Sequence, residues 1–362
     1  MFNLLVTGDN HLRVAQYSRT MRGEDFHRAL MWVVRKAVEL KVDAILNTGD
    51  VFNGSVLASR VFGQLQEADR YLQEAGIPMY TLSGNHEMSA PPWTAMFGCD
   101  GPGGIKGVDN LRVVLEKPGE KLVLHGLPFM PADEMREALA ALEPCDVLMW
   151  HGAVREFCGF PTQTAISETE FPEEKIGCAM LGDIHVHELH TLPGGTVIGY
   201  PGSTELYSDG EDTEKKAWLL HASAGVKPVR CESIPLQSRP VVHLELRSED
   251  DMDAAVAAVK AAGEMPLVFA RYSLSLPGAM ARLGTTFGPD VCMLRAFPLP
   301  ALDAGRMDAG KGVEELRVRD LVCEFLPKGT ADYELALLLA DRDTADVEAL
   351  IDLFVEQQVS AA

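Results

Sequence analysis

Five short polar segments interrupt the first half of this 362-residue chain, and most of them directly follow a short apolar run. They contain Asp, His and Asn, whose side chains supply oxygen and nitrogen ligands to divalent cations. One such segment alone arises easily by chance. Five of them in order, within about 180 residues, predict a two-metal hydrolase site. The segments are Gly8-Asp9-Asn10-His11, Gly49-Asp50-Val51-Phe52-Asn53, Gly84-Asn85-His86-Glu87, His151-Gly152 and Gly182-Asp183-Ile184-His185.

Strand and helix patterns alternate around the first three segments. Residues 3–7, 44–47 and 78–82 are short apolar runs typical of buried strands, whereas residues 24–40 and 59–74 have helical patterns, the first with apolar residues every three or four positions. This β-α-β-α-β order predicts a parallel sheet with right-handed crossovers. Because functional residues in such sheets lie at the carboxyl ends of the strands, we expect the three segments to converge.

The chain from there to residue 236 has a different pattern. Strand-like stretches follow one another, with turn signals such as Pro193-Gly194-Gly195 between them. Two sheets that face each other fit this number of strands. With the helices outside, residues 1–236 are predicted to form an α/β fold, a four-layer α-β-β-α sandwich. The expected strands are 111–115, 121–124, 146–150, 179–181, 189–192, 196–199 and 217–221.

Two further parts are expected after this domain. Residues 237–300 show the order strand, helix, strand, helix, strand, which predicts a smaller α/β domain. Residues 301–362 continue a linker rich in Pro, Gly and Ala and then have a helical pattern, which predicts a helical C-terminal tail. The acidic stretch of this tail has an apolar stripe that is either core or a surface for a partner, and it consists of Val347, Leu350, Ile351 and Phe354.

Composition limits the location and the partners of the chain. No apolar run reaches the roughly 18 residues that span a bilayer, and the N-terminus lacks the features of a signal peptide. The seven cysteines are scattered without a Cys-x-x-Cys pair, which favours a reducing cytoplasm. A net charge of −21 argues against a broad basic surface for nucleic acid. Bound cations, a local basic patch or a basic partner would still permit a nucleic-acid substrate.

The residues of the first two segments suit a pair of cations about 3.5–4 Å apart, which clamp the attacking and leaving oxygens of a phosphate ester. Asp9 and His11 are two positions apart, so they point to the same side of an extended chain. Asp50 is the candidate for the carboxylate that bridges both cations. Gly49 before it permits a tight turn of the backbone.

The other three segments add a mixed set of donors. Asn85 offers a neutral carbonyl oxygen, and His86 beside it is placed to act on a substrate. His151 follows an apolar strand and therefore lies at a strand end. Asp183 and His185 are two positions apart and face the same way.

In order and spacing these segments resemble the calcineurin-like metallophosphoesterase superfamily, over residues 1 to about 207. Its pattern is D-x-H, G-D-x-x-(D/N), G-N-H-(E/D), H-G and G-H-x-H. Residues 84–87 and the run Gly-Tyr-Pro-Gly-Ser-Thr-Glu at 199–205 are most similar to the SbcD family, nuclease subunits that work with an SMC-like ATPase on DNA ends. The unit at 237–300 resembles that family's capping domain, and the tail would correspond to its ATPase-binding segment.

The resemblance implies two ligand sets that share one residue. Position 183 departs from the family, which has His where this chain has Asp183. A carboxylate suits hard cations such as Mn²⁺ or Mg²⁺, but its shorter arm predicts a shifted or weaker second metal. The first metal would take Asp9, His11, Asp50 and His185, and the second Asp50, Asn85, His151 and Asp183.

The resemblance also assigns catalytic roles. His86 would be the general acid or a stabiliser of the transition state, with Asp50 as the second catalytic residue. The predicted reaction is hydrolysis of a phosphodiester by water that two divalent cations activate, Mn²⁺ in the first place and Mg²⁺ as the alternative.

The resemblance implies a Mn²⁺-dependent DNA nuclease subunit of SbcD type, exonuclease or endonuclease, that acts in DNA repair and recombination, and the cysteine pattern favours the cytoplasm. The partners that it implies are DNA and an SMC-like ATPase, with a homodimer as one option. One alternative is a metallophosphoesterase that acts on a phosphoprotein or a nucleotide. Another is a catalytically weakened scaffold, which only Asp183 supports. The arginines near the motif loops are either solvated or contacts for phosphate, and they are Arg13, Arg19, Arg22 and Arg60.

Overall fold

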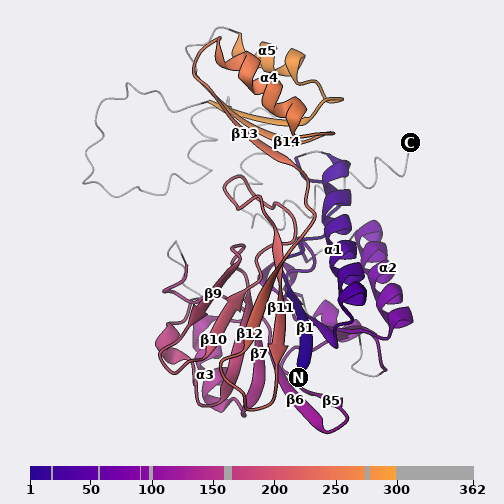
Figure 1. The fold of residues 1–362 in the computed structure, drawn as a ribbon, viewed down its shortest axis with the longest axis vertical. Coiled ribbons are helices and arrows are strands. Elements are labelled where there is room, and N and C mark those ends of the chain that lie inside the picture. The colour runs from indigo at the N-terminus through magenta and orange to yellow at the C-terminus, as the bar shows by residue number, and fades with distance from the viewer. Residues whose placement is uncertain are drawn as a thin grey trace, which may run out of the picture. The chain divides into compact units, whose positions relative to one another are not determined.

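The computed structural model describes residues 1–298 apart from 18, 56–57, 90, 98–100, 159–164 and 274–277. Two compact units divide at Ser238 and Arg239, and Figure 1 shows their elements. The tail expected at 301–362, with its apolar stripe, lies outside the described residues. The domain limits 1–236, 237–300 and 301–362 stay a prediction.

The first sheet of the Met1–Ser238 unit has six strands in the order β12-β11-β1-β2-β3-β4. β1 to β4 run parallel, as expected for the first three, whereas β11 and β12 are antiparallel additions at one edge. The strands are β1 (Phe2–Thr7), β2 (Ala44–Asn47), β3 (Pro78–Thr81), β4 (Gly104–Gly107), β11 (Lys216–Ala222) and β12 (Arg230–Pro235).

The second sheet also has six strands, in the order β5-β6-β7-β8-β10-β9. β6, β7, β8 and β10 are parallel, and the edge strands β5 and β9 pair antiparallel with their neighbours. The strands are β5 (Arg112–Lys117), β6 (Glu120–Leu127), β7 (Cys145–His151), β8 (Ile176–Gly182), β9 (Glu188–Thr191) and β10 (Val197–Tyr200).

Helices cover the outer faces of both sheets. α1 (Thr20–Leu40) and α2 (Ser59–Ala75) share one buried core with the first sheet (Figure 1). α3 (Ala132–Ala141) shares another with the second sheet. A third core fills the space between the sheets, and Leu4 and Val6 of β1 point into it. The expected four-layer α-β-β-α sandwich is therefore confirmed.

The layers bring the five polar segments to the carboxyl ends of parallel strands. β1, β2 and β3 end at Thr7, Asn47 and Thr81, shortly before the first three segments. β7 ends at His151, which pairs in parallel register with Gly182 at the end of β8. Loops from both sheets can therefore contribute to one site.

The unit that begins at Arg239 has a three-stranded parallel sheet in the order β13-β14-β15. Its elements follow the expected order of strand, helix, strand, helix, strand. One core joins the sheet and the helices. The elements are β13 (Val241–Leu246), α4 (Asp251–Ala261), β14 (Leu267–Tyr272), α5 (Ala279–Thr286) and β15 (Met293–Pro298). Among the described residues, no helix is both long and apolar enough to cross a bilayer.

Three elements of the first unit lack a sequence signal. β4 contains two glycines and Lys106 in four residues, and it is a strand because it pairs with β3. α3 buries only Met135 and Leu139, so its apolar periodicity is too short to recognise. β12 is a mostly exposed edge strand whose pairing with β11 determines its conformation.

Arg22 joins α1 to the loop that follows β10. Its guanidinium is fully buried and donates hydrogen bonds to Asp25 (2.9 Å), Glu205 (3.0 Å), the Gln16 side chain (2.9 Å) and the carbonyl oxygen of Leu206 (2.6 Å). Both interpretations of Arg22, as a solvated residue and as a phosphate contact, are therefore wrong. The residue compensates two buried carboxylates and holds Glu205 and Leu206 against the helix.

We expect Arg22→Met to lower the free energy of unfolding by about 3–5 kcal/mol, because it leaves two buried carboxylates without their cation. Urea unfolding followed by circular dichroism measures this change. Arg28→Met is the matched control, since Arg28 contacts the same Asp25 but has a side chain that is 56% exposed. The control should change stability by less than about 1 kcal/mol; equal effects of both variants would contradict the structural role.

Candidate metal centre

Backbone hydrogen bonds align the loops that follow β1 and β2. The N–H groups of Asp9 and His11 donate to the carbonyl oxygens of Gly49 and Asp50, both at 2.9 Å. Leu12 continues the pairing to Val51 at 2.8 Å. The first two polar segments therefore lie side by side, so the backbone itself sets the spacing of Asp9, His11 and Asp50.

Four of the predicted ligands have a left-handed backbone conformation. The φ angles are 48° at Asp9, 47° at His11, 51° at Asp50 and 84° at Asp183. Residues with a Cβ rarely adopt this region, although Asp, Asn and His do so more often than others. Each such residue costs of order 1–3 kcal/mol, and such strain is concentrated at functional sites.

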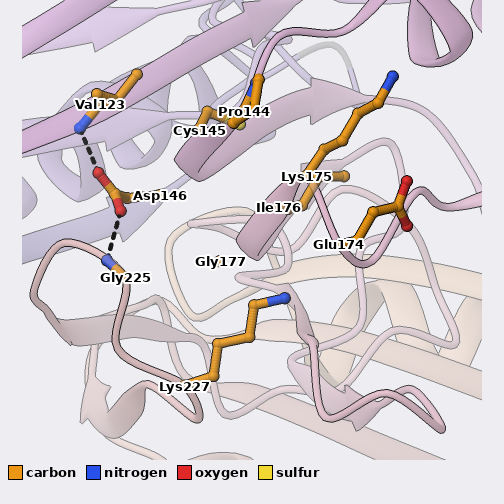
Figure 2. Close-up of a pocket in the computed structure, with 10 residues that line it drawn as sticks. All are labelled: Val123, Pro144, Cys145, Asp146, Glu174, Lys175, Ile176, Gly177, Gly225 and Lys227. Carbon is orange, nitrogen blue, oxygen red and sulfur yellow. Dashed lines mark hydrogen bonds between the residues drawn. The ribbon is translucent and has the colours of Figure 1, made fainter.

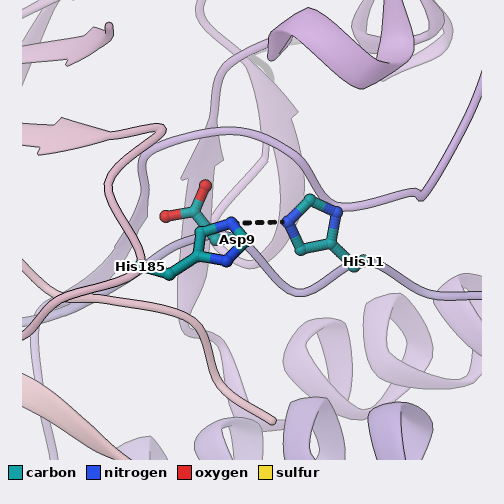
Figure 3. A group of neighbouring side chains, drawn as sticks. All are labelled: Asp9, His11 and His185. Atoms are coloured by element: carbon teal, nitrogen blue, oxygen red, sulfur yellow. Dashed lines mark hydrogen bonds between the residues drawn. The ribbon is translucent and has the colours of Figure 1, made fainter. Parts of the chain in front are cut away.

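The first group of donors consists of Asp9, His11 and His185, whose ligand atoms all lie within 4.8 Å of one another (Figure 3). The Nε2 atoms of His11 and His185 are 3.0 Å apart. Two nitrogens at right angles on one cation, each about 2.1 Å from it, are also about 3 Å apart. Oδ2 of Asp9 is buried and has no hydrogen-bond partner in the part of the chain that the structure describes. These donors fit a divalent cation.

A second group consists of Asp9, Asp50 and His151, whose ligand atoms also lie within 4.8 Å of one another. Oδ2 of Asp50 lies 3.8 Å from Nε2 of His11 and 3.6 Å from Nε2 of His151. Oδ1 of Asn85 lies 3.0 Å from the same nitrogen of His151. The Asp50 carboxylate is thus between two sets of donors, where a bridging ligand is needed.

The outer nitrogens of two histidines are fixed by the protein. Nδ1 of His151 contacts the carbonyl oxygen of Thr48 at 2.8 Å, and Nδ1 of His185 contacts Oε1 of Glu211 at 2.8 Å. Such contacts orient a ligand ring and leave Nε2 for the metal. Among the functional residues, Glu211 was not recognised from the sequence, because it is 26 residues from His185 in an irregular loop.

Glu211 also organises the loop that carries it. Burial alone would raise the pKa of this carboxyl, but the hydrogen bond and charge of His185, with those of Lys215, together lower it well below its usual range. The loop is therefore closed around a charged carboxylate next to the metal centre. The further donors to Glu211 are the Ser203 hydroxyl, the N–H of Tyr207, the N–H and hydroxyl of Ser208, and Lys215.

Glu87 is a second positioning residue that sequence reasoning missed, although it lies within a recognised segment. Its buried carboxylate accepts the N–H of Gly84 at 3.0 Å and the N–H of Phe52. The N–H of His86 in the same turn donates to Oδ1 of Asp50 at 3.1 Å. Burial, as the largest cause, raises the pKa of Glu87 to about 7. Glu87 therefore joins the third polar segment to the second.

Electrostatics also favour a bound cation. Burial raises the pKa of Asp9, and burial with the charges of Glu87 and Asp9 raises the pKa of Asp50 well above its usual range. Burial lowers the pKa of His11 and His151. A carboxylate cluster of this kind is costly to ionise alone, and a divalent cation removes that cost.

The structure brings six of the seven predicted ligands together and leaves the carboxylate of the seventh outside the donor groups. Asp9, His11, Asp50, His151 and His185 belong to the donor groups, and Asn85 contacts His151. Among the described residues Asp183 belongs to none of the groups. It lines a pocket of about 560 Å³, together with Asp50, His86 and His185.

His86 lies at the edge of the donors. Its Nε2 is 3.9 Å from Oδ2 of Asp50, and it forms a group with His11 and Asp50. The side chain of His86 is 19% exposed and lines the same pocket. Tyr207 closes this side, with its ring 4.4 Å from that of His11. The position suits contact with a substrate.

A second pocket lies at the opposite ends of β7 and β8 (Figure 2). Its Asp146 accepts the N–H groups of Val123 (2.8 Å) and Gly225 (2.9 Å), and the ammonium of Lys175 donates to a backbone carbonyl oxygen. Its charged groups mostly have structural partners. The metal donors of the described residues are all elsewhere.

Residues 2–187 match the family model described as calcineurin-like phosphoesterase. The match covers more than half of the chain and contains all five polar segments. The chain belongs to the calcineurin-like phosphoesterase family. The superfamily resemblance seen in the motifs is confirmed.

This calcineurin-like phosphoesterase is similar over most of its length to two curated archaeal proteins named "DNA double-strand break repair protein Mre11". The one from Methanocaldococcus jannaschii is 24% identical over 351 residues, 91% of this chain and 92% of that protein. The one from Haloferax volcanii is 28% identical over 393 residues, 96% of this chain and 86% of that protein. Among solved structures, a dimetal phosphatase from Danio rerio aligns with 65% of this chain and 99% of its own, at 11% identity and a TM-score of 0.40.

We expect Gly84→Ala to abolish metal binding by the phosphoesterase. The φ of Gly84 is −96°, which any residue adopts, but an added Cβ would overlap Oδ1 of Asp50. Isothermal titration with Mn²⁺ measures the loss. Gly63→Ala is the control, because Gly63 is exposed in α2 and a Cβ added there would meet no described atom within 4 Å outside the backbone of the helix. Alanine at this position should stabilise the helix by about 0.5–1 kcal/mol. Normal metal binding by Gly84→Ala would contradict the close approach.

We expect Glu211→Gln to weaken metal binding by about 10–100-fold, because His185 loses the carboxylate that orients its ring. Titration of the purified variant with Mn²⁺ gives the affinity. Glu214→Gln is the matched control, since its side chain is 80% exposed and pairs with Lys216. The same loss in both variants would point to a general charge effect instead.

Proposed function

We propose that this protein is a metal-dependent nuclease subunit that hydrolyses phosphodiester bonds of DNA. The observation that carries the proposal is the Asp50 carboxylate, which lies 3.8 Å and 3.6 Å from histidine nitrogens of two donor sets. A shared carboxylate between two cations is the arrangement that clamps a phosphate ester. Family membership supports the phosphoesterase chemistry.

The proposed ligand roles follow the donor groups. The cations, Mn²⁺ by preference, would activate water and neutralise the phosphate. Asp50 would bridge the two positions. Position one would take Asp9, His11, Asp50 and His185, and position two would take Asp50, Asn85 and His151, with Asp183 beside it.

His86 acts in this proposal as a neutral donor. Burial, followed by the charge of Arg13, lowers the pKa of His86 to about 4, so the ring is uncharged near pH 7. Of the two roles that the family resemblance implies, a hydrogen bond to the phosphoryl or leaving oxygen therefore fits better than donation by an imidazolium.

DNA is the proposed substrate because the two archaeal relatives are named as proteins of DNA double-strand break repair. A chain of net charge −21 needs help to hold a polyanion, and the proposed partner is an SMC-like ATPase. A homodimer is a second element of the proposed assembly. The described cysteines are free, which supports the proposed cytoplasmic location.

A smaller phosphodiester is the second candidate substrate. The pocket beside the donors is lined by Asp183, Asp209, Glu211 and Asp212, which disfavour a long polyanion. A Mn²⁺ assay with single-stranded DNA, double-stranded DNA and a small phosphodiester, with and without the ATPase, separates the candidates. Cleavage of the small ester alone would overturn the DNA proposal.

We expect Asp50→Asn to remove Mn²⁺-dependent DNA cleavage by more than about 1,000-fold, because the bridging charge is lost from both positions. Gel-based cleavage assays measure this. Asp133→Asn is the control for the same chemical change, since its side chain is 95% exposed on α3 and should leave the rate unchanged. Cleavage by Asp50→Asn at the normal rate would contradict the two-metal proposal.

We expect His86→Ala to lower kcat by about 100–1,000-fold, the usual loss for one donor to a developing negative charge. Bound metal, measured by titration, should remain at the level of the unaltered protein. The loss should be equal at pH 6.5 and pH 8.5, because a ring with a pKa of about 4 is neutral at both. A loss that shrinks as the pH rises would show that an imidazolium acts, and a loss of metal would make His86 a ligand.

A further inference from the structure

The two proposed metal positions differ in the chemistry of their donors. Position one has two imidazoles, His11 and His185, grouped with the carboxylate of Asp9, and Asp50 lies 3.8 Å from His11. Position two has a single imidazole, His151, grouped with the carboxylates of Asp9 and Asp50, and Oδ1 of Asn85 lies beside it. Imidazole suits borderline cations such as Zn²⁺, whereas carboxylate and carbonyl oxygens suit Mg²⁺ and Mn²⁺.

Asp183 lies outside the donor groups but contributes to the difference between the two positions. Its N–H group donates to Oδ1 of Asp9 at 3.1 Å, so its backbone already supports position one. Its carboxylate lines the pocket with Asp50 and His86, yet it belongs to none of the donor groups of the described residues. No described residue donates a hydrogen bond to this carboxylate.

The two positions also differ in how far they are preformed. At position one the histidine nitrogens already lie 3.0 Å apart, and Glu211 holds the His185 ring from behind. At position two only one imidazole is in place, that of His151, which is fixed by Thr48 and grouped with Asp9 and Asp50, and the carboxylate of Asp183 is outside the donor groups of the described residues. Position two is therefore less complete than position one, and we expect weaker binding there.

From this geometry we infer that the two positions are unequal, and that Asp183 makes position two a weaker, oxygen-rich site that selects a hard cation. The inference rests on the proposed two-metal function. Position one fills first and accepts Zn²⁺ or Mn²⁺. Position two fills second, with Mn²⁺ or Mg²⁺, so that a mixed pair of cations is a stable state of the protein.

The experiment titrates chelator-treated full-length protein with metal alone, by calorimetry and by the electron paramagnetic resonance of Mn²⁺. We expect two binding steps with Mn²⁺, the second weaker by at least about tenfold. One equivalent of Zn²⁺ added first should leave one Mn²⁺ site, with the signal of an uncoupled ion. Two equal steps, or Zn²⁺ that displaces Mn²⁺ from both positions, would overturn the inference.

Two substitutions test the role of Asp183. Asp183→Asn keeps the shape but removes the charge, and we expect it to weaken the second step by about tenfold while the first step stays within about threefold. Asp183→His should shift the second step towards Zn²⁺ by about tenfold or more. Asp212→His is the matched control, because Asp212 lines the same pocket without belonging to a donor group of the described residues.

The outcomes also separate this inference from the proposed function. Two unequal steps in a protein that cuts no DNA would sustain the inference and overturn the nuclease proposal. DNA cleavage with two equal metal steps would do the reverse. The backbone N–H of Asp183, which donates to Oδ1 of Asp9, is present in both variants. An effect of the Asp183 variants on the first step alone would therefore show that the side chain acts on position one, and would overturn the inference.

Discussion

The burial of several carboxylates around Asp50 is the constraint on which the rest of this site depends. Asp9 and Asp50 are almost fully buried, and the pKa of each is raised by burial and by the other acids nearby. Such a cluster stays ionised only at a high cost, unless cations compensate it. The contacts of Glu87 and Glu211 hold the donor residues close together. Such short distances suit a bound metal, whereas without a metal they favour protonation of the carboxylates.

The fold provides this arrangement by joining loops of two sheets. Backbone pairing between the segments after β1 and β2 places Asp9 and His11 against Asp50, and the ends of β7 and β8 supply His151 and residues 183–185. The left-handed backbone at several donors costs free energy that the surrounding cores must offset. Buried hydrogen bonds such as those of Arg22 help to hold the loops at this end of the sandwich in place.

Much of this architecture could be predicted from the sequence because the signals are local. Apolar runs followed by Gly-Asp or Asn-His identify strand ends, and parallel strands bring those ends together. Glu211 could not be found in this way, since its contact with His185 depends on the path of an irregular loop. β4 was missed for a related reason: pairing with β3 makes it a strand, whereas its own residues do not favour one.

The acidic character of the chain and a phosphate substrate are compatible through the metal centre itself. Without cations, the pocket beside Asp50 is lined by Asp183, Asp209, Glu211 and Asp212, and its field repels phosphate. The two divalent cations of the proposed function would add about four positive charges at the same place and reverse the sign locally. Metal loading would then control both chemistry and substrate attraction, and the weaker of the two positions would set the cation concentration at which the change occurs. We infer that this position is the one beside Asp183, whose carboxylate lines the pocket but belongs to no donor group of the described residues.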